Sequence, residues 1–251
     1  MDSLLDLTGK VALVTGSSRG IGAAIACALD HHGARCVVNY VADPGGRNEA
    51  DARAVAADLK DPILLQCDVG DDAQVAAMMQ QIQSQLGGLD ILVNNAGILR
   101  DRSLKKITSE EWESVLRVNL TGVFNCIRHA QPILRADGRI VNLSSLAAQM
   151  GFFGQSNYAA SKAGVLGLTR VAARELAKER ITVIAIAPGV IDTDMMRGVP
   201  EEIRQQYLQQ IPLARMGTAD DIANTVLFLV SSSASYITGQ VIHVNGGLYL
   251  S

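Results

Sequence analysis

A tyrosine and a lysine stand four positions apart in the stretch SNYAASKAG, residues 156–164. On a helix these positions share one face, so Tyr158 and Lys162 would lie side by side. A free phenol has a pKa of about 10, and a neighbouring cation lowers that value by stabilising the phenolate. A phenol tuned in this way can exchange a proton with an alcohol oxygen. The same spacing also fits an ordinary pair on a helix surface, so the pair alone does not establish a site.

Two further polar residues could complete such a site. Ser145 ends the run RIVNLSS, and the loop between it and Tyr158 could fold its hydroxyl back beside the phenol. A hydroxyl in that place can hydrogen-bond a substrate oxygen and orient it. Asn119 lies inside a predicted helix with Gly122 close behind, and both are poor residues for a helix interior. We expect a local break there, which would present a carbonyl or amide to a water molecule; a tolerated polar residue on the helix face is the alternative.

A glycine-rich loop follows the first predicted strand, in TGSSRGIG, residues 15–22. Gly16 allows a sharp turn, Gly20 lets the backbone approach a pyrophosphate, and Gly22 lets the following helix pack closely on its strand. The free N–H groups at the start of that helix attract phosphate. The loop therefore predicts a dinucleotide site.

The end of the second predicted strand indicates which dinucleotide is bound. NAD enzymes of this design place an acidic residue there to hold the ribose diol, whereas this chain has Asn39 and Tyr40. Arg19 in the glycine loop can reach the same corner, and a guanidinium binds phosphate well. We therefore expect NADP(H), although Asp43 nearby weakens the argument slightly and Arg19 could be a solvated loop charge.

Two later loops complete the predicted cofactor site. Asp68 follows the third predicted strand and is expected to receive the adenine, although it could be an ordinary helix cap. The run NNAG, residues 94–97, follows the fourth strand and fits a loop close to the adenosine ribose.

The elements that must position these residues alternate along the chain. Short β-branched runs predict strands over residues 10–16, 35–40, 62–68, 90–97, 139–145, 181–189 and 240–247. The segments between them predict helices over residues 20–33, 47–60, 72–87, 108–135, 157–179, 200–210 and 218–231. The capping pattern Thr108-x-x-Glu111 opens the longest of these helices.

This alternation predicts the α/β class. We expect a single doubly wound Rossmann-type domain over residues 1–251, with a seven-stranded parallel sheet and helices on both faces. Ligands bind such sheets at the carboxyl ends of the strands, where the unusual residues above fall. Residues 194–217, rich in Gln and Met, are expected to form a substrate lid or else a pair of surface helices.

Composition excludes several other classes of protein. The net charge of −3 gives no electrostatic reason to expect nucleic acid or an anionic membrane as a partner. No apolar run is long enough to span a bilayer, and the first residues do not resemble a secretory signal. The four cysteines are far apart and the four histidines are scattered, so we expect reduced thiols and no metal site. A cytoplasmic protein is the resulting expectation.

Taken together, the motifs resemble the short-chain dehydrogenase/reductase superfamily. The resemblance covers essentially the whole chain, in TGSSRGIG, CDV, NNAG, VNLTG, NLSS, YAASK, APGVIDTDM and VNGG. It implies a catalytic tetrad of Asn119, Ser145, Tyr158 and Lys162, and hydride transfer from NADPH to a ketone. It also implies that the APGVIDTDM segment flanks the nicotinamide. The residues expected to bind the cofactor are Gly16, Ser18, Arg19, Gly20, Ile21, Gly22, Asn39, Tyr40, Asp68, Val69, Asn95, Ala96, Gly97, Tyr158, Lys162, Pro188, Gly189, Ile191 and Thr193.

Within the superfamily the chain is most similar to 3-oxoacyl-acyl-carrier-protein reductases, in FGQSNYAASKAG, IPLARMG and YITGQVIHVNGGLYL. This resemblance implies an acyl-thioester substrate, acyl carrier protein as a partner, a role in fatty acid synthesis and a homotetramer. Members often carry two arginines for the carrier where this chain has Ala136 and Glu179. The neighbouring Arg135, Arg139, Lys178 and Arg180 could replace them.

Other functions stay open at this point. The same chemistry could act on acetoacetyl-CoA, a quinone, a steroid or a sugar. The run NNAGILRDRS also looks like the dehydrogenase domain of peroxisomal β-oxidation enzymes, which use NAD. A non-catalytic NADP-binding regulator is a different class, and the complete Asn-Ser-Tyr-Lys set argues against it.

Overall fold

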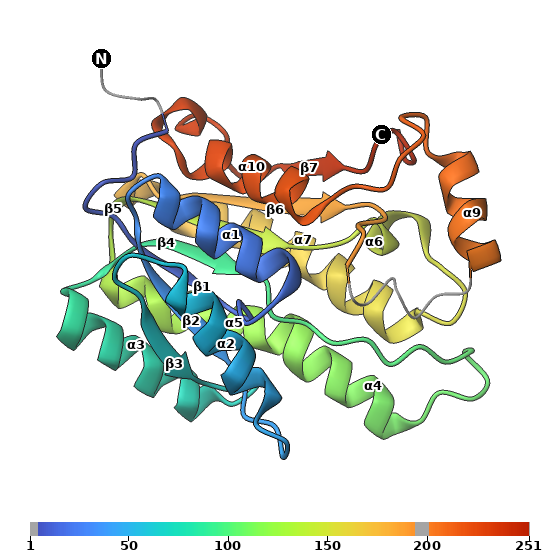
Figure 1. Cartoon of the computed structure of the whole chain (residues 1–251), viewed down its shortest axis with the longest axis horizontal. Helices are drawn as coiled ribbons and strands as arrows, with labels where there is room; N and C mark the ends of the chain where they lie inside the picture. The colour runs from blue at the N-terminus through green and yellow to red at the C-terminus, as the bar shows by residue number, and fades with distance from the viewer. Residues whose placement is uncertain (1–4, 194–200, 251) are drawn as a thin grey trace.

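Seven parallel strands form one sheet in the computed structural model, which describes residues 5–193 and 201–250 (Figure 1). The strand order is β3-β2-β1-β4-β5-β6-β7, and it reverses direction between β1 and β4. The strands are β1 Val11–Val14, β2 Arg35–Tyr40, β3 Ile63–Gln66, β4 Leu89–Asn94, β5 Leu134–Leu143, β6 Thr182–Pro188 and β7 Val241–Val244. The predicted α/β fold class is confirmed. The point of reversal is where such sheets bind ligands.

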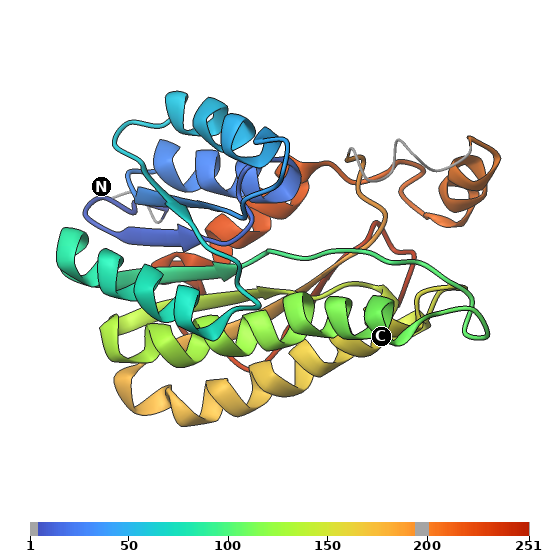
Figure 2. The same cartoon turned by 90° about the horizontal axis from the view of Figure 1, so that it is seen from below.

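Helices cover both faces of this sheet (Figure 2). The α-helices are α1 Gly20–His31, α2 Arg47–Ala57, α3 Asp72–Leu86, α4 Ser109–Leu116, α5 Gly122–Ala130, α6 Ala147–Met150, α7 Ser156–Glu175, α9 Glu201–Gln210 and α10 Ala219–Val230. Shorter helical turns are η1 Arg117–Thr121, η2 Gln131–Ile133, η3 Ala177–Glu179 and η4 Ser232–Ala234.

Two apolar layers hold the helices to the sheet. One layer packs α1 and α10 on one face, through side chains such as Leu29 and Val226. The other packs α3, α5 and α7 on the opposite face, through Met78, Cys126 and Val165. The strands β1, β4 and β6 are buried along their whole length and therefore read as nearly continuous apolar runs.

The long helix predicted over residues 108–135 is interrupted. The capping box between Thr108 and Glu111 starts α4 as expected. The chain then forms a π-helical turn over Arg117–Thr121 and resumes as α5, which ends in a short turn containing Pro132. Proline has no N–H to continue a helix, and β5 consequently begins at Leu134, earlier than predicted.

Part of the predicted lid lies outside the described residues, namely residues 194–200. The helix α9 that follows stands apart from the sheet (Figures 1 and 2). The rings of Tyr207 on α9 and Phe152 form a T-shaped pair, with 6.2 Å between the centroids. Within residues 5–193 and 201–250, no helix combines the length and apolar character needed to span a membrane.

Candidate active site

Three elements bring the four proposed catalytic side chains to the carboxyl edge of the sheet. Ser145 follows β5, Asn119 lies in the π-helical turn, and Tyr158 and Lys162 lie at the start of α7. The Lys162 ammonium is 5.7 Å from the centroid of the Tyr158 ring. A Cβ atom at Gly97 would lie 3.3 Å from Asn119 Oδ1 and 3.7 Å from Lys162 Nζ, so these two side chains meet beside Gly97.

The electrostatics of the pair differ from the expectation. Burial raises the pKa of Tyr158; a hydrogen bond with Ser145 acts in the opposite direction, and the Asp101 carboxylate adds a smaller upward shift. Burial also lowers the pKa of Lys162, to about 8. The expectation that Lys162 lowers the tyrosine pKa is wrong for this structure, because the Lys162 ammonium donates instead to the Leu143 carbonyl at 2.7 Å.

The end of β5 fixes the position of α7. The Ser144 hydroxyl donates to the Lys162 carbonyl at 2.9 Å, while Ser145 accepts a hydrogen bond from the Ala147 N–H at 3.1 Å. Successive strand residues point to opposite faces, so adjacent serines serve two purposes. Ser144 supports the helix, and Ser145 is left near the phenol.

The π-helical turn confirms the predicted break in the helix around Asn119. A π-turn inserts one residue into an α-helix, and such turns often occur at functional sites. The buried Asn119 amide accepts from the Ile98 N–H at 2.8 Å and donates to the Ile98 carbonyl at 3.0 Å. The side-chain amide therefore anchors the loop after β4.

Close packing explains why the glycine loop is made of glycines. A Cβ atom at Gly22 would lie 2.4 Å from the Gly16 carbonyl oxygen, and one at Gly16 would lie 2.9 Å from Ala96 Cα. Gly20 has a φ of +57° and no atom within 4 Å of its Cβ position, so its outer side is open. An open, glycine-lined loop at a helix N-terminus is suited to a phosphate group.

Two asparagines, the buried Asn39 and the partly buried Asn95, hold this loop from below. Asn39 accepts from the Gly16 N–H at 3.0 Å and donates to the carbonyls of Leu65 and Cys67, each at 3.2 Å. Asn95 donates to the carbonyls of Thr15 and Gly16, each at 3.0 Å. Asn39 is almost fully buried, so the structure places it beneath the loop, with its side chain turned toward main-chain groups.

Arg19 and Asp43 lie at the corner between β2 and α2, and each has partners within the chain. Arg19 is half-exposed, pairs with Asp51 at 3.2 Å and hydrogen-bonds Asn48. The Asp43 carboxylate accepts from the main-chain N–H groups of Arg47 and Asn48 at the start of α2, and the latter bond is the largest cause of its lowered pKa. Asp43 therefore caps a helix.

The remaining cofactor candidates line the neighbouring strand ends. The Asp68 carboxylate pairs with Arg117 at 2.8 Å and accepts from the Gly70 N–H at 2.9 Å. Beyond β6, the Leu146 N–H donates to the Pro188 carbonyl at 2.9 Å, and the Gly189 N–H donates to Val244 at 2.9 Å. The predicted nicotinamide segment thus starts between the ends of β5 and β7.

Comparisons with known proteins agree with this arrangement. Residues 16–249 match the family described as Enoyl-(Acyl carrier protein) reductase. The 3-oxoacyl-[acyl-carrier-protein] reductase of Staphylococcus aureus is 51% identical over 245 residues, which cover 96% of this chain and 98% of that protein. The corresponding reductase of Vibrio cholerae is 43% identical, over 98% of this chain and 100% of that protein.

A solved structure shares the fold along almost the whole chain. The short chain dehydrogenase from Burkholderia cenocepacia, in complex with NADP, superposes with a TM-score of 0.89 and 38% identity, over 96% of this chain and 98% of that chain. The chain belongs to the short-chain dehydrogenase/reductase family. The sequence-based resemblance to this family, and within it to 3-oxoacyl-acyl-carrier-protein reductases, is confirmed.

Sequence reasoning missed several side chains that organise this short-chain dehydrogenase/reductase site. The Thr15 hydroxyl accepts from the N–H groups of Asn95 and Ala96, at 3.0 and 3.1 Å. The Ser161 hydroxyl donates to the Tyr158 carbonyl at 2.7 Å and accepts from Asn119 at 3.4 Å. Asn157, the residue before Tyr158 in the chain, is fully buried. Their signal was the run of small polar residues inside TGSS and SNYAASK.

The suggested replacement arginines lie at the opposite edge of the sheet. Arg135 pairs with the buried Asp90, and Arg180 with Asp137 at 2.7 Å. Arg139 is buried and donates to the carbonyls of Asp137 and Gly138, at 2.5 and 3.0 Å. These three cations therefore have partners within the chain, and their replacement of the carrier-binding arginines stays a prediction.

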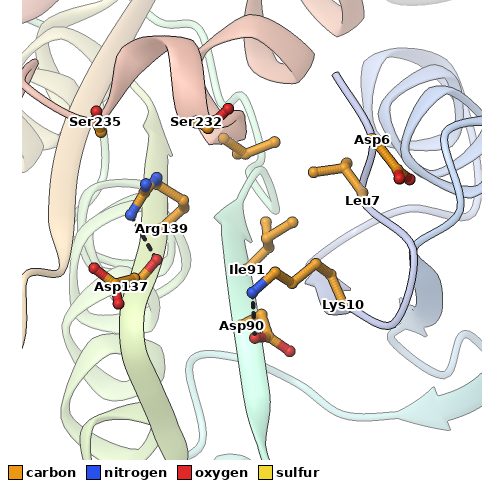
Figure 3. A pocket seen from close by; sticks show the side chains of 10 residues that line it. Asp6, Leu7, Lys10, Asp90, Ile91, Asp137, Arg139, Ser232 and Ser235 are labelled. Carbon is orange, nitrogen blue, oxygen red and sulfur yellow. Dashed lines mark hydrogen bonds and ion pairs between the residues drawn. The ribbon is translucent and has the colours of Figure 1, made fainter. Parts of the chain in front are cut away.

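A cavity of about 370 Å³ also lies at that opposite edge (Figure 3). Lys10, Asp90, Asp137 and Arg139 line it, and they lie just before or near the beginning of the strands. None of the proposed catalytic or cofactor residues lines this cavity. Because family members of this topology bind ligands at the carboxyl ends of the strands, the cavity is not the active site.

Proposed function

We propose that the protein reduces a 3-oxoacyl thioester to the 3-hydroxyacyl thioester with NADPH. The observation that carries this proposal is that Tyr158 contacts both Ser145 and Lys162 at the carboxyl edge of the sheet, with Lys162 and Asn119 beside Gly97. The curated relatives reduce 3-oxoacyl groups by name, over nearly the whole of this chain. The alternative of a non-catalytic regulator would not require a proton donor at this point.

The cofactor would lie across the point of strand reversal. NADPH, when bound, supplies the hydride. The open side of Gly20 suits the pyrophosphate, and Arg19 suits the 2′-phosphate because no free carboxylate stands at the end of β2. The remaining contacts are assigned to the predicted residues after β3, β4 and β6. The neighbour from Burkholderia cenocepacia holds NADP, which supports this choice.

The protein side chains would handle the proton. The raised pKa of Tyr158 keeps the phenol protonated at neutral pH, so it can donate a proton to the alkoxide oxygen as that oxygen forms. Ser145 would hydrogen-bond the same oxygen and orient the carbonyl. Lys162 would hold the nicotinamide ribose and pass a proton toward the phenol, and Asn119 would anchor the water that supplies it.

A second reaction has to be separated from this one, because the matching family is described as an enoyl reductase. Enoyl reduction delivers hydride to a carbon–carbon double bond, whereas the hydrogen bonds of Ser145 and Tyr158 suit a carbonyl oxygen. The test is NADPH oxidation with matched acetoacetyl and crotonyl thioesters of CoA and of acyl carrier protein. We expect turnover of the acetoacetyl thioesters; turnover of crotonyl thioesters alone would overturn the proposal.

The same assay compares the two carriers. We propose acyl carrier protein as the physiological carrier, with a lower KM for that thioester than for the CoA thioester. We further propose that residues 1–251 form one domain that holds both cofactor and substrate. Residues 194–217 would form a lid over the substrate. The protein would be a cytoplasmic homotetramer. The contact between Phe152 and Tyr207 supports a lid that reaches the segment between Ser145 and Tyr158.

A further inference from the structure

Asn157 precedes the proposed proton donor and is fully buried. Its side-chain oxygen accepts from the Tyr158 N–H at 2.7 Å. Its side-chain nitrogen donates to two main-chain carbonyls, those of Arg100 and Glu111, each at 3.1 Å. One amide thus joins the first turn of α7 to the loop after β4 and to α4.

The start of α7 is also tied to the next residues of that loop, because the Gln155 side chain donates to Asp101 at 3.0 Å and the Arg102 N–H donates to the Gly154 carbonyl at 2.8 Å. The N-cap residue, Gln155, makes no side-chain cap hydrogen bond. The first N–H groups of a helix have no partner within the helix, and Tyr158 carries one of them. Asn157 therefore supplies the partner that a capping residue normally provides, at the residue that bears the phenol.

A second amide holds the same loop from the other side. Asn119 binds both main-chain groups of Ile98, two residues before Arg100. The segment 98–100 is therefore fastened between the π-helical turn and α7. Ser161 closes the arrangement, since it hydrogen-bonds both the Tyr158 carbonyl and the Asn119 amide. The position of the phenol relative to Asn119 depends on both amides.

We propose that Asn157 is a positioning residue for Tyr158, acting through its two donor bonds to Arg100 and Glu111. The inference rests on the proposed function, because it assigns Tyr158 as the proton donor. Loss of these bonds would let α7 shift relative to segment 98–100 while the phenol and Lys162 remain present. A misplacement of about 1 Å can reduce turnover by about 100-fold.

The experiment compares Asn157→Ala and Asn157→Asp with Thr169→Val. The aspartate keeps the acceptor for the Tyr158 N–H but cannot donate to the two carbonyls when ionised. Thr169 is buried on the same helix and hydrogen-bonds Asn142 at 2.9 Å and Val165 at 2.8 Å, so its variant is matched for the loss of a buried polar group. We expect both Asn157 variants to lower kcat about 10- to 100-fold, with the Kd for NADPH changed less than threefold. Thr169→Val should keep kcat within threefold of the wild type.

Hydrogen exchange gives a reading that does not depend on the substrate. Asn157→Ala and Asn157→Asp should speed amide exchange in residues 98–102 and 156–160, whereas Thr169→Val should not. Wild-type kcat in either position-157 variant, or unchanged exchange in these segments, would overturn the positioning role. A wild-type protein inactive on 3-oxoacyl thioesters would instead overturn the proposed function, and the exchange result would still decide the role of Asn157.

Discussion

The Tyr158 phenol and the Lys162 ammonium are tuned by burial more than by each other. Removing either group from water favours its neutral form, which raises the tyrosine pKa and lowers the lysine pKa. A neutral phenol is the form that can donate a proton during reduction. In the oxidative direction the phenol must first lose its proton, so the rate should rise with pH.

Tyr158→Phe keeps the ring and removes the proton donor. We expect kcat to fall by about two to four orders of magnitude, the usual contribution of general acid catalysis, with little change in NADPH binding. The rise in oxidative rate with pH should also disappear. Steady-state kinetics and a cofactor titration check these outcomes. Tyr236→Phe, on a fully exposed side chain, is the control. Near-normal turnover of Tyr158→Phe would contradict the assignment of the donor.

Lys162 should make stability depend on pH. Its pKa is about 8 in the folded chain against 10.5 for an exposed lysine, a shift that corresponds to about 3 kcal/mol. Below pH 8 the folded state bears the full cost of a buried charge, and the cost fades as pH rises through 8 toward 10.5, because the unfolded state then binds more protons. Lys162→Met should therefore stabilise the cofactor-free protein most at pH 7 and progressively less above pH 8.

Urea unfolding of the wild type and Lys162→Met between pH 7 and 10 measures this difference. The comparison removes the contribution of the buried cysteines, which are the same in both proteins. Lys178→Met, at an exposed position, should show no such trend. A difference in unfolding free energy that does not change with pH would contradict this prediction, because it would mean that folding does not lower the pKa of Lys162.

At the scale of elements, we expect the turn from β2 into α2 to set the cofactor preference. The Tyr40 side chain is buried, whereas Val41 directly after the strand is 46% exposed. An acidic residue placed at the exposed position could hold a ribose diol and would repel a 2′-phosphate. Tyr40 is the wrong site for that change, since a carboxylate there would be buried.

Val41→Asp should therefore move the preference from NADPH toward NADH. We expect the ratio of kcat/KM for NADPH to kcat/KM for NADH to fall at least about tenfold, equivalent to about 1.4 kcal/mol. Val41→Asn has nearly the same shape without the charge and should change the ratio much less. A wild-type enzyme that already prefers NADH would contradict the role given to Arg19.

Over the whole molecule, the sequence was sufficient for the architecture because its signals are local. Glycines in TGSSRGIG and the alternation of β-branched and helical runs do not depend on distant contacts. The burial of Tyr158 and Lys162 does, and for that reason the direction of the tyrosine pKa was predicted wrongly. The partners of Asn119 and Asn157 are main-chain groups of a distant loop, which no spacing in the sequence reveals.

The outer faces of α5 and α7 support the expected homotetramer. On α7, Val165 and Leu166 are buried within the chain itself and are not available for an interface. Phe124 and Val171 remain 43% and 52% exposed. Light scattering should give four times the mass of the chain, and Phe124→Glu with Val171→Glu should lower it. Gln80→Glu on α3 adds a charge at a different surface and should leave the measured mass unchanged. A monomeric wild type would exclude the tetramer.

The π-helical turn has a consequence for the evolution of this chain. One extra residue between Arg117 and Thr121 is what separates this turn from an ordinary α-helix. Deleting a single codon there would restore regular helical hydrogen bonding and would turn Asn119 by about 100° relative to the helix that follows. We expect this deletion to favour the helix and to harm the proposed site, so that selection on activity, and not on folding, would act against it.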